Sequence, residues 1–332
     1  ERKIKDKING GVNISLFEQY WSSKEVILNT NLKPKIEKIA ALGFKSVRLP
    51  VAFDLFLENG STNLPIALID KIGETYNYCL DYGLALTITY HYGKLTDTNG
   101  FTERDKILWI WKQMQLKFKG MGYESLFFEL YNEPTIQADN WRKDIQYIVN
   151  GLRVEDENRY YIIGGTNYNN LNELPQLGKL SDKKLLYCFH FYEPYLFTHQ
   201  GAEWTSEKSY MTGLPYPYKR RKMPKMASEA KGTIVEENYK KYDLEATKEY
   251  MFDHIRKIES VCAKKGMPLV CTEFGVIGTV PENYRNRYLK DILSIFDKLN
   301  IPSQVWDLDQ RFAVLDANGD LLKSISKWLG TL

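Results

Sequence analysis

Short β-rich runs alternate with longer helical patterns along the whole chain. Apolar, β-branched runs predict eight strands at 11–15, 46–51, 85–90, 126–131, 160–164, 185–191, 269–272 and 303–308. Helical periodicity predicts segments at 32–42, 66–82, 102–119, 141–155, 244–265, 282–299 and 321–329, and a weaker one at 171–177. This alternation is typical of a parallel sheet with crossover helices.

Eight strands favour a closed barrel over an open doubly wound sheet. An open sheet usually has fewer strands and often carries a Gly-rich phosphate loop after the first one. Here the first strand reads Gly10-Gly11-Val12-Asn13-Ile14-Ser15, with no such loop behind it. With neither a linker nor a repeat in view, we expect an α/β fold in which residues 1–332 form a single catalytic (β/α)₈ TIM-barrel domain.

One connection, at about 193–243, is much longer than the others and shows no clear periodic element. It is rich in aromatic residues: Tyr195, Phe197, Trp204, Tyr210, Tyr216 and Tyr218. Because loops after barrel strands belong to the catalytic face, we expect this loop to form one wall of a substrate groove, with Trp204 as an aromatic platform. The basic run at 219–222 is expected to be a solvated tip, the alternative being recognition of acidic sugars.

Composition narrows the class of protein. Hydrophobic residues are 43% and charged residues 26%, as in soluble globular proteins, and a net charge of +3 spread along the chain gives no nucleic-acid footprint. No apolar run approaches the roughly 20 residues that cross a bilayer. The four cysteines form no CxxC pair, and Cys188 and Cys271 are expected to be buried free thiols. No His/Asp/Glu spacing argues for a catalytic metal. We expect a monomer that needs no cofactor.

Polar residues gather where the predicted strands end, and barrel enzymes carry their catalytic groups at the carboxyl ends of strands. These residues are Arg48, His91, Asn132, Glu133, His190, Tyr192, Glu273 and Trp306. Two carboxylates facing one cleft suit acetal hydrolysis, in which Glu133 donates a proton to the leaving oxygen and Glu273 attacks the anomeric carbon. Arg48 and Tyr192 can hold Glu273 ionised. Asn132 and His91 can hold sugar hydroxyls, and Trp306 offers a flat face to a sugar ring.

Glu129 competes with Glu133 for the acid role, since it lies four residues earlier on the same face of the strand. At about 3.3 Å per residue it would lie roughly 13 Å deeper, among the packed layers of the barrel. We expect it to be a buried structural acid paired with a cation or a hydroxyl group.

The ordered motifs resemble glycoside hydrolase family 5, the cellulase-type retaining barrel glycosidases. They run from Gly10-Gly11-Val12-Asn13 through the motifs at 45–50, 128–134, 190–192 and 272–275 to Trp306. The resemblance places Arg48, His91, Asn132, Glu133, His190, Tyr192, Glu273 and Trp306 at the family's active-site positions. One departure is His91-Tyr92-Gly93, where many members carry a second histidine.

The resemblance implies a retaining hydrolase of β-linked polysaccharide, foremost an endo-β-1,4-glucanase that is secreted, periplasmic or on the cell surface. The alternatives are a mannanase, a xyloglucanase or a non-catalytic carbohydrate-binding barrel, and a cytoplasmic location also stays open. Retention implies carboxyl groups roughly 5–5.5 Å apart. Glu133 should have a higher pKa than Glu273, since Glu133 must be protonated while Glu273 is ionised.

Overall fold

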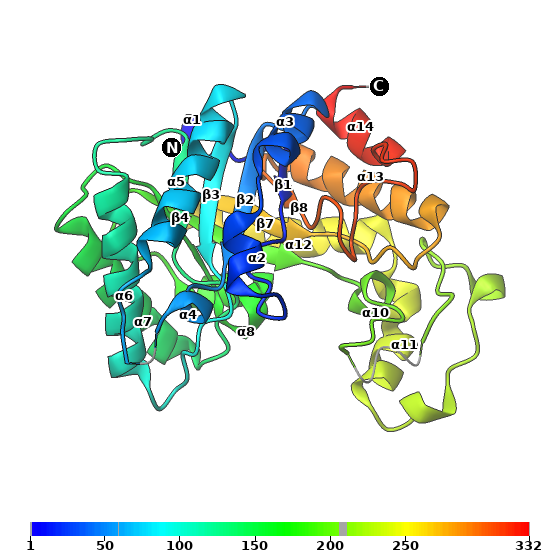
Figure 1. Cartoon of the computed structure of the whole chain (residues 1–332). Coiled ribbons are helices and arrows are strands. Elements are labelled where there is room, and N and C mark those ends of the chain that lie inside the picture. Colours follow the sequence, from blue (N-terminus) through cyan, green and yellow to red (C-terminus); the bar gives the residue numbers. More distant parts are fainter. Residues whose placement is uncertain (1, 59, 206–210, 332) are drawn as a thin grey trace.

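The computed structural model describes residues 2–58, 60–205 and 211–331, and its centre is a ring of parallel strands (Figure 1). The order β7-β6-β5-β4-β3-β2-β1-β8 joins neighbours in sequence, and a bridge between Cys271 and Ser303 brings β7 to the start of β8. The expected (β/α)₈ TIM barrel is confirmed. The strands are β1 Gly11–Asn13, β2 Ser46–Val51, β3 Ala85–Tyr90, β4 Leu126–Glu129, β5 Tyr161–Gly164, β6 Leu185–Phe191, β7 Leu269–Phe274 and β8 Gln304–Val305.

The strand predictions at 46–51, 85–90 and 185–191 match residue for residue, whereas the strand ends at the active site differ. β4 stops at Glu129, two residues early, although the next backbone groups still bond to neighbouring strands: the N–H of Leu130 donates to Ile162 and that of Asn132 to Tyr90. β8 keeps only two of the six expected residues. At the carboxyl ends of β4 and β8 the backbone therefore departs from regular strand pairing.

Helices surround the barrel. The longer ones are α3 Lys33–Ala41, α5 Ile66–Asp81, α6 Gly100–Lys117, α7 Ala138–Arg153, α12 Lys248–Lys264, α13 Glu282–Lys298 and α14 Lys323–Leu329, close to the predicted spans. The sequence prediction missed α1 Arg2–Lys5, α2 Lys24–Asn29, α4 Phe53–Phe56, α8 Thr166–Asn169, α10 Tyr195–Thr198 and α11 Ile234–Glu245. The weak segment at 171–177 comprises η1 Leu171–Glu173 and α9 Leu174–Leu177. α7 shows why the long helices were predictable, since its buried Trp141, Ile145, Ile148 and Leu152 follow helical spacing.

Inside the barrel, apolar and charged side chains occupy different levels. Phe127, Ile162, Leu186, Cys188 and Val270 pack together with no exposed surface. Side chains alternate along a strand, so the residues two places beyond Phe127 and Cys188, Glu129 and His190, face the same interior closer to the carboxyl ends. The apolar level thus forms a floor beneath the polar groups.

The segment 193–243 was expected to lack regular structure, and that expectation is wrong. It contains α10, η3 Arg220–Lys222, η4 Ser228–Ala230 and most of α11, while the helix predicted at 244–265 is α12 alone. The two helices separate at Ala246 because the side chain of Thr247 caps α12 by accepting from the N–H of Tyr250, 3.3 Å away. α11 was hard to predict because only Val235 and Tyr242 of its side chains are buried.

Several smaller expectations have outcomes. All four cysteines are buried and free. The basic run at 219–222 is exposed, as expected of a solvated tip. Among the described residues, no helix is both long enough and apolar enough to cross a membrane. Tyr210, one of the aromatic residues expected in the long connection, lies outside the described residues.

Candidate active site

A single buried guanidinium joins four strand ends. Arg48 of β2 donates from Nε and Nη2 to the two oxygens of Glu129, at 2.8 and 2.7 Å. Its Nη2 also donates to Oδ1 of Asn132, at 2.8 Å, and its Nη1 donates to Oε1 of Glu273, at 2.6 Å. Neither Arg48 nor Glu129 has exposed surface, which confirms Glu129 as a buried acid paired with a cation. Glu129 lies closer to the strand-end residues than expected, because one guanidinium bonds to both Glu129 and Asn132.

An irregularity in β7 sets the position of Glu273. Phe189 pairs with Cys271, but His190 pairs with Glu273, so Thr272 is an extra residue in the ladder. Such a bulge re-aims the side chains that follow it. Glu273, almost fully buried, then receives hydrogen bonds on both oxygens, from Arg48 on Oε1 and from the hydroxyl of Tyr192 on Oε2, at 2.9 Å.

Glu133 lies just beyond β4 in a left-handed backbone conformation, with φ of 50°. Its Oε1 is 2.6 Å from Nδ1 of His190. The same ring nitrogen lies 3.5 Å from Oε2 of Glu273, so the imidazole stands between the two carboxylates. The Glu133 side chain is 31% exposed, whereas that of Glu273 is 6% exposed. One carboxylate therefore reaches toward solvent and the other is enclosed.

These environments shift the protonation equilibria. Burial raises the pKa of Glu133 to about 7, against the opposing charge of Arg48 and with a smaller contribution from Glu129. Burial also raises the pKa of Glu273, while His190 and Arg48 act to lower it. Burial, rather than the charge of Glu273, is thus the main cause at Glu133. Burial lowers the pKa of His190 to about 4, which leaves its imidazole neutral at neutral pH.

His91 directly follows β3, and Trp306 directly follows β8. Their rings are parallel within 8°, with centroids 6.0 Å apart. The backbone around Trp306 is tightly packed, because a Cβ at Gly275 would collide with the Trp306 carbonyl oxygen. Burial lowers the pKa of His91 well below its ordinary value, with Arg48 the next contributor. A neutral imidazole beside an indole face suits contact with an uncharged sugar.

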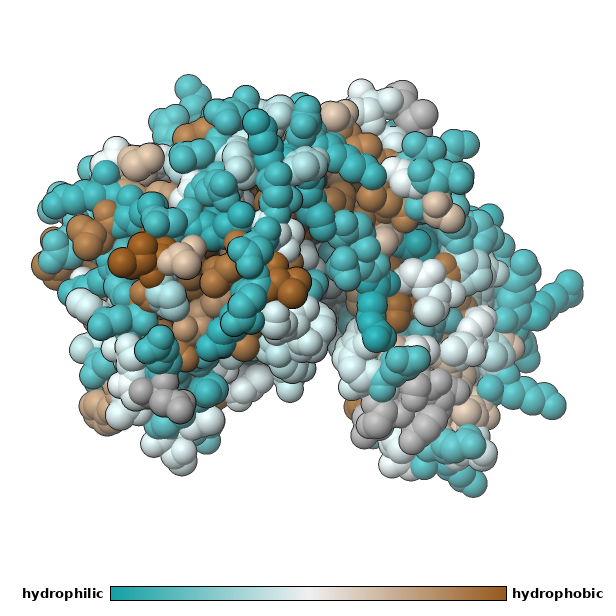
Figure 2. Space-filling view, viewed as in Figure 1, coloured by the Kyte–Doolittle hydropathy of each residue, from teal (hydrophilic) through white to brown (hydrophobic). Residues whose placement is uncertain are grey.

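Trp204 does not touch the carboxylates. It packs on Phe312, with ring centroids 6.2 Å apart, and Phe312 packs edge-on against Tyr192 at 5.8 Å. Trp204 is half exposed, and Arg311 lies over its ring. In Figure 2 the surface is hollowed between the part that carries α4 and α8 and the part that carries α10 and α11 (compare Figure 1). The long segment therefore stands as one wall of a cleft.

Sequence reasoning missed several residues near the site. Asn13 at the end of β1 accepts from Nη1 of Arg48, at 2.9 Å, and donates to the carbonyl of Thr272, at 3.0 Å. Asn13 could have been predicted as a site residue, because it ends the Gly-Gly-Val-Asn run of the first strand. Three aromatic side chains, Tyr20, Trp21 and Tyr92, are exposed; Tyr20 contacts the other two edge to face, and Tyr92 packs against His91. No strand-end rule points to Tyr20 or Trp21.

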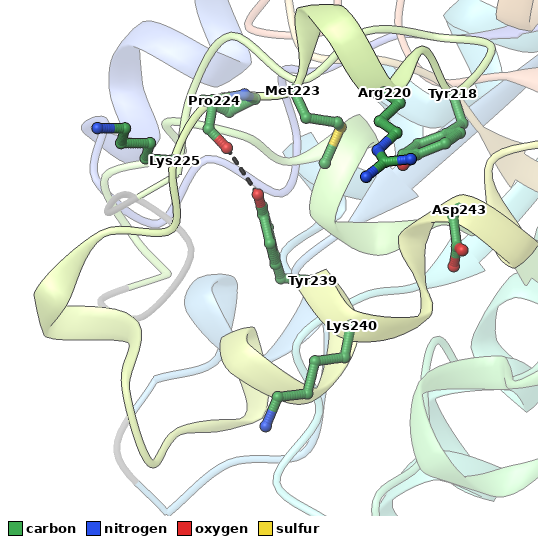
Figure 3. A pocket seen from close by; sticks show the side chains of 8 residues that line it. All are labelled: Tyr218, Arg220, Met223, Pro224, Lys225, Tyr239, Lys240 and Asp243. Atoms are coloured by element: carbon green, nitrogen blue, oxygen red, sulfur yellow. Dashed lines mark hydrogen bonds between the residues drawn. The ribbon is translucent and has the colours of Figure 1, made fainter.

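A separate hollow of about 370 Å³ lies on the long segment, between its loop and α11 (Figure 3). The hydroxyl of Tyr239 donates to the carbonyl of Pro224 within it, at 2.7 Å. None of the side chains that line it is a predicted site residue. They are Tyr218, Arg220, Met223, Pro224, Lys225, Tyr239, Lys240 and Asp243.

Glu133, His190 and Glu273 each bring one donor atom within 4.8 Å of the others, a spacing that a cation could use. Glu273 shares the positive charge of Arg48 with Glu129, since the guanidinium lies 2.6 Å from Oε1 of Glu273 and 2.7 Å from Oε1 of Glu129. The arrangement thus combines a carboxylate bonded to a guanidinium with a second carboxyl group whose pKa is raised to about 7. Acetal hydrolysis needs these two groups.

A barrel with such a pair at its carboxyl ends defines a glycoside hydrolase. The chain belongs to the cellulase family, glycosyl hydrolase family 5, whose sequence pattern matches residues 6–311. It is 29% identical over 329 residues to endoglucanase C of Acetivibrio thermocellus, across 92% of this chain and 91% of that protein. It is 26% identical over 356 residues to endoglucanase 3 of Fibrobacter succinogenes, across 99% of this chain.

The chain spans 54% of the length of that second relative. Among solved structures, a hyperthermophilic endo-β-1,4-glucanase in complex with substrate superposes with a TM-score of 0.82 at 20% identity, covering 100% of this chain and 99% of that one. At that identity the likeness shows the barrel fold.

Proposed function

We propose that this chain is a retaining endo-β-1,4-glucanase in which Glu133 is the general acid/base and Glu273 the nucleophile. The observation that carries the proposal is the spacing: an oxygen of Glu133 and an oxygen of Glu273 lie within 4.8 Å. Retaining glycosidases separate their carboxyl groups by about 5–5.5 Å, whereas inverting ones need about 6.5–9.5 Å to admit a water molecule.

The first step forms a covalent glycosyl-enzyme. Glu273 attacks the anomeric carbon while Glu133 donates its proton to the glycosidic oxygen, which leaves with that proton as the new hydroxyl group of the departing chain. Arg48 keeps Glu273 ionised, and the hydrogen bonds from Arg48 and Tyr192 fix its carboxylate plane. A pKa of about 7 lets Glu133 carry the proton at neutral pH and then lose it.

The second step reverses these roles. Glu133, now ionised, removes a proton from water, the water oxygen attacks the anomeric carbon, and Glu273 leaves as a carboxylate. Two inversions restore the β configuration. His190, neutral and 2.6 Å from Glu133, can stabilise both protonation states of that carboxyl group.

The cleft supports a polymeric substrate. Trp204 on the long segment and the Tyr20–Trp21–Tyr92 cluster offer exposed aromatic faces, and Trp306 after β8 is partly exposed. Flat apolar faces suit sugar rings, and Asn132 and His91 are placed to contact hydroxyl groups. The endoglucanase relatives support glucan as the substrate class.

The experiment is reducing-sugar release on carboxymethyl cellulose, mixed-linkage glucan, xyloglucan, mannan and xylan. We expect internal cleavage of β-1,4-glucan, seen as a fast fall in viscosity, and no release by Glu273→Gln. Faster release from mannan or xyloglucan would replace the substrate assignment. Equal activity of Glu273→Gln on every polysaccharide would overturn the site assignment.

We also propose that residues 1–332 act as one catalytic domain, as a monomer and outside the cytoplasm. The continuous barrel supports the single domain. Light scattering on the purified chain would test the monomer, since a mass of twice 38.8 kDa would contradict it.

A further inference from the structure

After β5 the chain makes a left-handed turn of three residues. Asn167, Tyr168 and Asn169 have φ of 52°, 63° and 54°. Left-handed backbone is unfavourable for residues with a side chain, and asparagine tolerates it better than most. The N–H of Asn170 donates to the carbonyl of Thr166, at 3.1 Å, and closes the turn.

The turn buries Asn169 and exposes its neighbours. Asn169 has no exposed surface, whereas Asn167 and Tyr168 face solvent. Room for the buried amide comes from Gly164, where a Cβ would collide with the Asn169 side chain. The turn therefore serves to place one amide inside the barrel rim.

That amide contacts His190. Nδ2 of Asn169 lies 3.3 Å from Nε2 of His190 and 3.7 Å from the sulfur of Cys188. The other ring nitrogen, Nδ1, faces Glu133 at 2.6 Å and Glu273 at 3.5 Å. Each nitrogen of the buried imidazole thus has its own partner.

Two independent contacts select one tautomer. A neutral imidazole carries a single N–H. The ionised Glu273 places Oε2 3.5 Å from Nδ1, so a proton there is attracted to it, whereas a bare lone pair would be repelled; Oε1 of Glu133, 2.6 Å away, can accept from the same proton. An amide N–H directed at Nε2 requires that nitrogen to accept. Both contacts favour the proton on Nδ1.

We propose that Asn169 is a positioning residue of the reaction, which holds His190 in the Nδ1–H tautomer and thereby keeps the acid proton of Glu133 on Oε2. If Nδ1–H donates to Oε1, that oxygen accepts, so the proton of the neutral carboxyl group must be on the other oxygen. With the opposite tautomer, Glu133 would donate its proton to Nδ1 rather than to the substrate. The inference rests on the proposed acid role of Glu133.

The test begins with the free enzyme, labelled with ¹⁵N-histidine. Long-range ¹H–¹⁵N spectra distinguish protonated from bare ring nitrogens, and a His190→Gln sample identifies the signals of His190 among the four histidines. We expect protonated Nδ1 and bare Nε2. A protonated Nε2 in the wild-type enzyme would overturn the proposal, whatever the variants do.

Asn169→Asp supplies the second test, since it places an acceptor against Nε2 and should leave that nitrogen protonated. We expect kcat/KM on cellopentaose, a poor leaving group, to fall about tenfold, a part of the roughly 10²–10⁴-fold that a general acid contributes. The rate on dinitrophenyl cellobioside should change little, because its leaving group needs little protonation.

Asn167→Asp is the matched control, since it makes the same change in the same left-handed turn on an exposed side chain. It should behave as the wild type. Equal losses in the two variants, or an unchanged tautomer in Asn169→Asp, would overturn the proposal. Failure of the acid assignment would appear separately, as unimpaired cellopentaose hydrolysis by Glu133→Ala.

Discussion

The centre of the barrel and the wall formed by 193–245 are held together in different ways. At the centre, Arg48 of β2 makes charge-assisted bonds of 2.6–2.9 Å to groups of β1, β4 and β7 and to Asn132, three residues after β4. The wall rests on ring contacts and on tyrosine hydroxyls that donate to carbonyls, such as Tyr239 to Pro224 and Tyr242 to Pro215. From this difference we expect substitutions at the centre to affect the reaction itself and substitutions in the wall to affect substrate length and identity.

The largest expected effect on activity comes from removing the two carboxylates of the centre in turn. Glu273→Ala should lose at least about 10⁴-fold in kcat, since loss of a catalytic nucleophile can cost about 10⁶. Added azide should partly restore turnover and give the α-glycosyl azide. With Glu133→Ala and a dinitrophenyl glycoside, azide should give the β product after two inversions.

NMR of the two azide products checks this prediction. Opposite anomeric configurations are expected, and the reverse assignment would exchange the two roles. If neither variant loses activity, the reaction takes place elsewhere in the molecule.

Removing the guanidinium should damage both the reaction and the fold. Arg48→Met leaves Glu129 and Glu273 buried without a cation, so we expect the free energy of unfolding to fall by about 3–5 kcal/mol. We also expect kcat to fall by about 10²–10³-fold, the range for loss of one preorganised charged contact. Denaturant unfolding and initial rates measure the two effects.

Arg159→Met is the matched control. Arg159 is also a fully buried arginine, paired with Asp156 and bonded to the carbonyl of Leu126 at the opposite end of β4. This variant should lose stability but keep its kcat. Similar losses of kcat in both variants would mean that stability, rather than the site, decides the rate.

The pH profile of the reaction tests the role of Glu133 at the centre. The pKa of Glu133 is raised to about 7, so its protonated fraction is high below that pH and falls as pH rises through it. For a substrate with a poor leaving group, kcat/KM should therefore fall about tenfold per pH unit on the alkaline side. A dinitrophenyl glycoside should show no such limb. An alkaline limb of equal size on both substrates would assign it to another group.

The smallest expected effect on activity comes from a substitution in the wall. Trp204→Ala should raise KM for long cello-oligosaccharides by about fivefold, in line with the roughly 0.5–1.5 kcal/mol of an aromatic contact, and change short ones less. Trp109→Ala, which removes a half-exposed tryptophan on α6, should change neither. Equal effects of Trp204→Ala on both lengths would leave the wall a structural role only.

The sequence predicted the centre of the barrel better than it predicted the wall. Strand ends of a barrel converge by geometry, so Arg48, Asn132, Glu133, His190, Tyr192 and Glu273 could be placed together, and the structure joins them in one network. Their catalytic roles stay predictions. Trp204 could be assigned to the wall, but not its packing on Phe312, which comes from a distant loop.

Other features had no pattern to reveal them. α11 buries too few apolar residues for its period to show, and Thr247 splits what looked like one helix. The extra residue in β7 is invisible in a run as regular as Leu269–Phe274, because its cause is pairing with β6. The left-handed turn at Asn167–Asn169 lies between the strand predicted at 160–164 and the weak helix predicted at 171–177, where no pattern indicated an element.

The bonds of Arg48 have a consequence for how the protein acquires activity during folding. Asn13 belongs to the first strand and Glu273 to the seventh, 225 positions beyond Arg48 in the chain, and both bind one nitrogen of that side chain. No early folding intermediate built from neighbouring strands can assemble this centre, because its ends meet only when the ring closes. Long-range contacts of this kind form late and slowly. We therefore expect a newly made chain to gain activity only after strands from both ends of the sequence have joined the barrel.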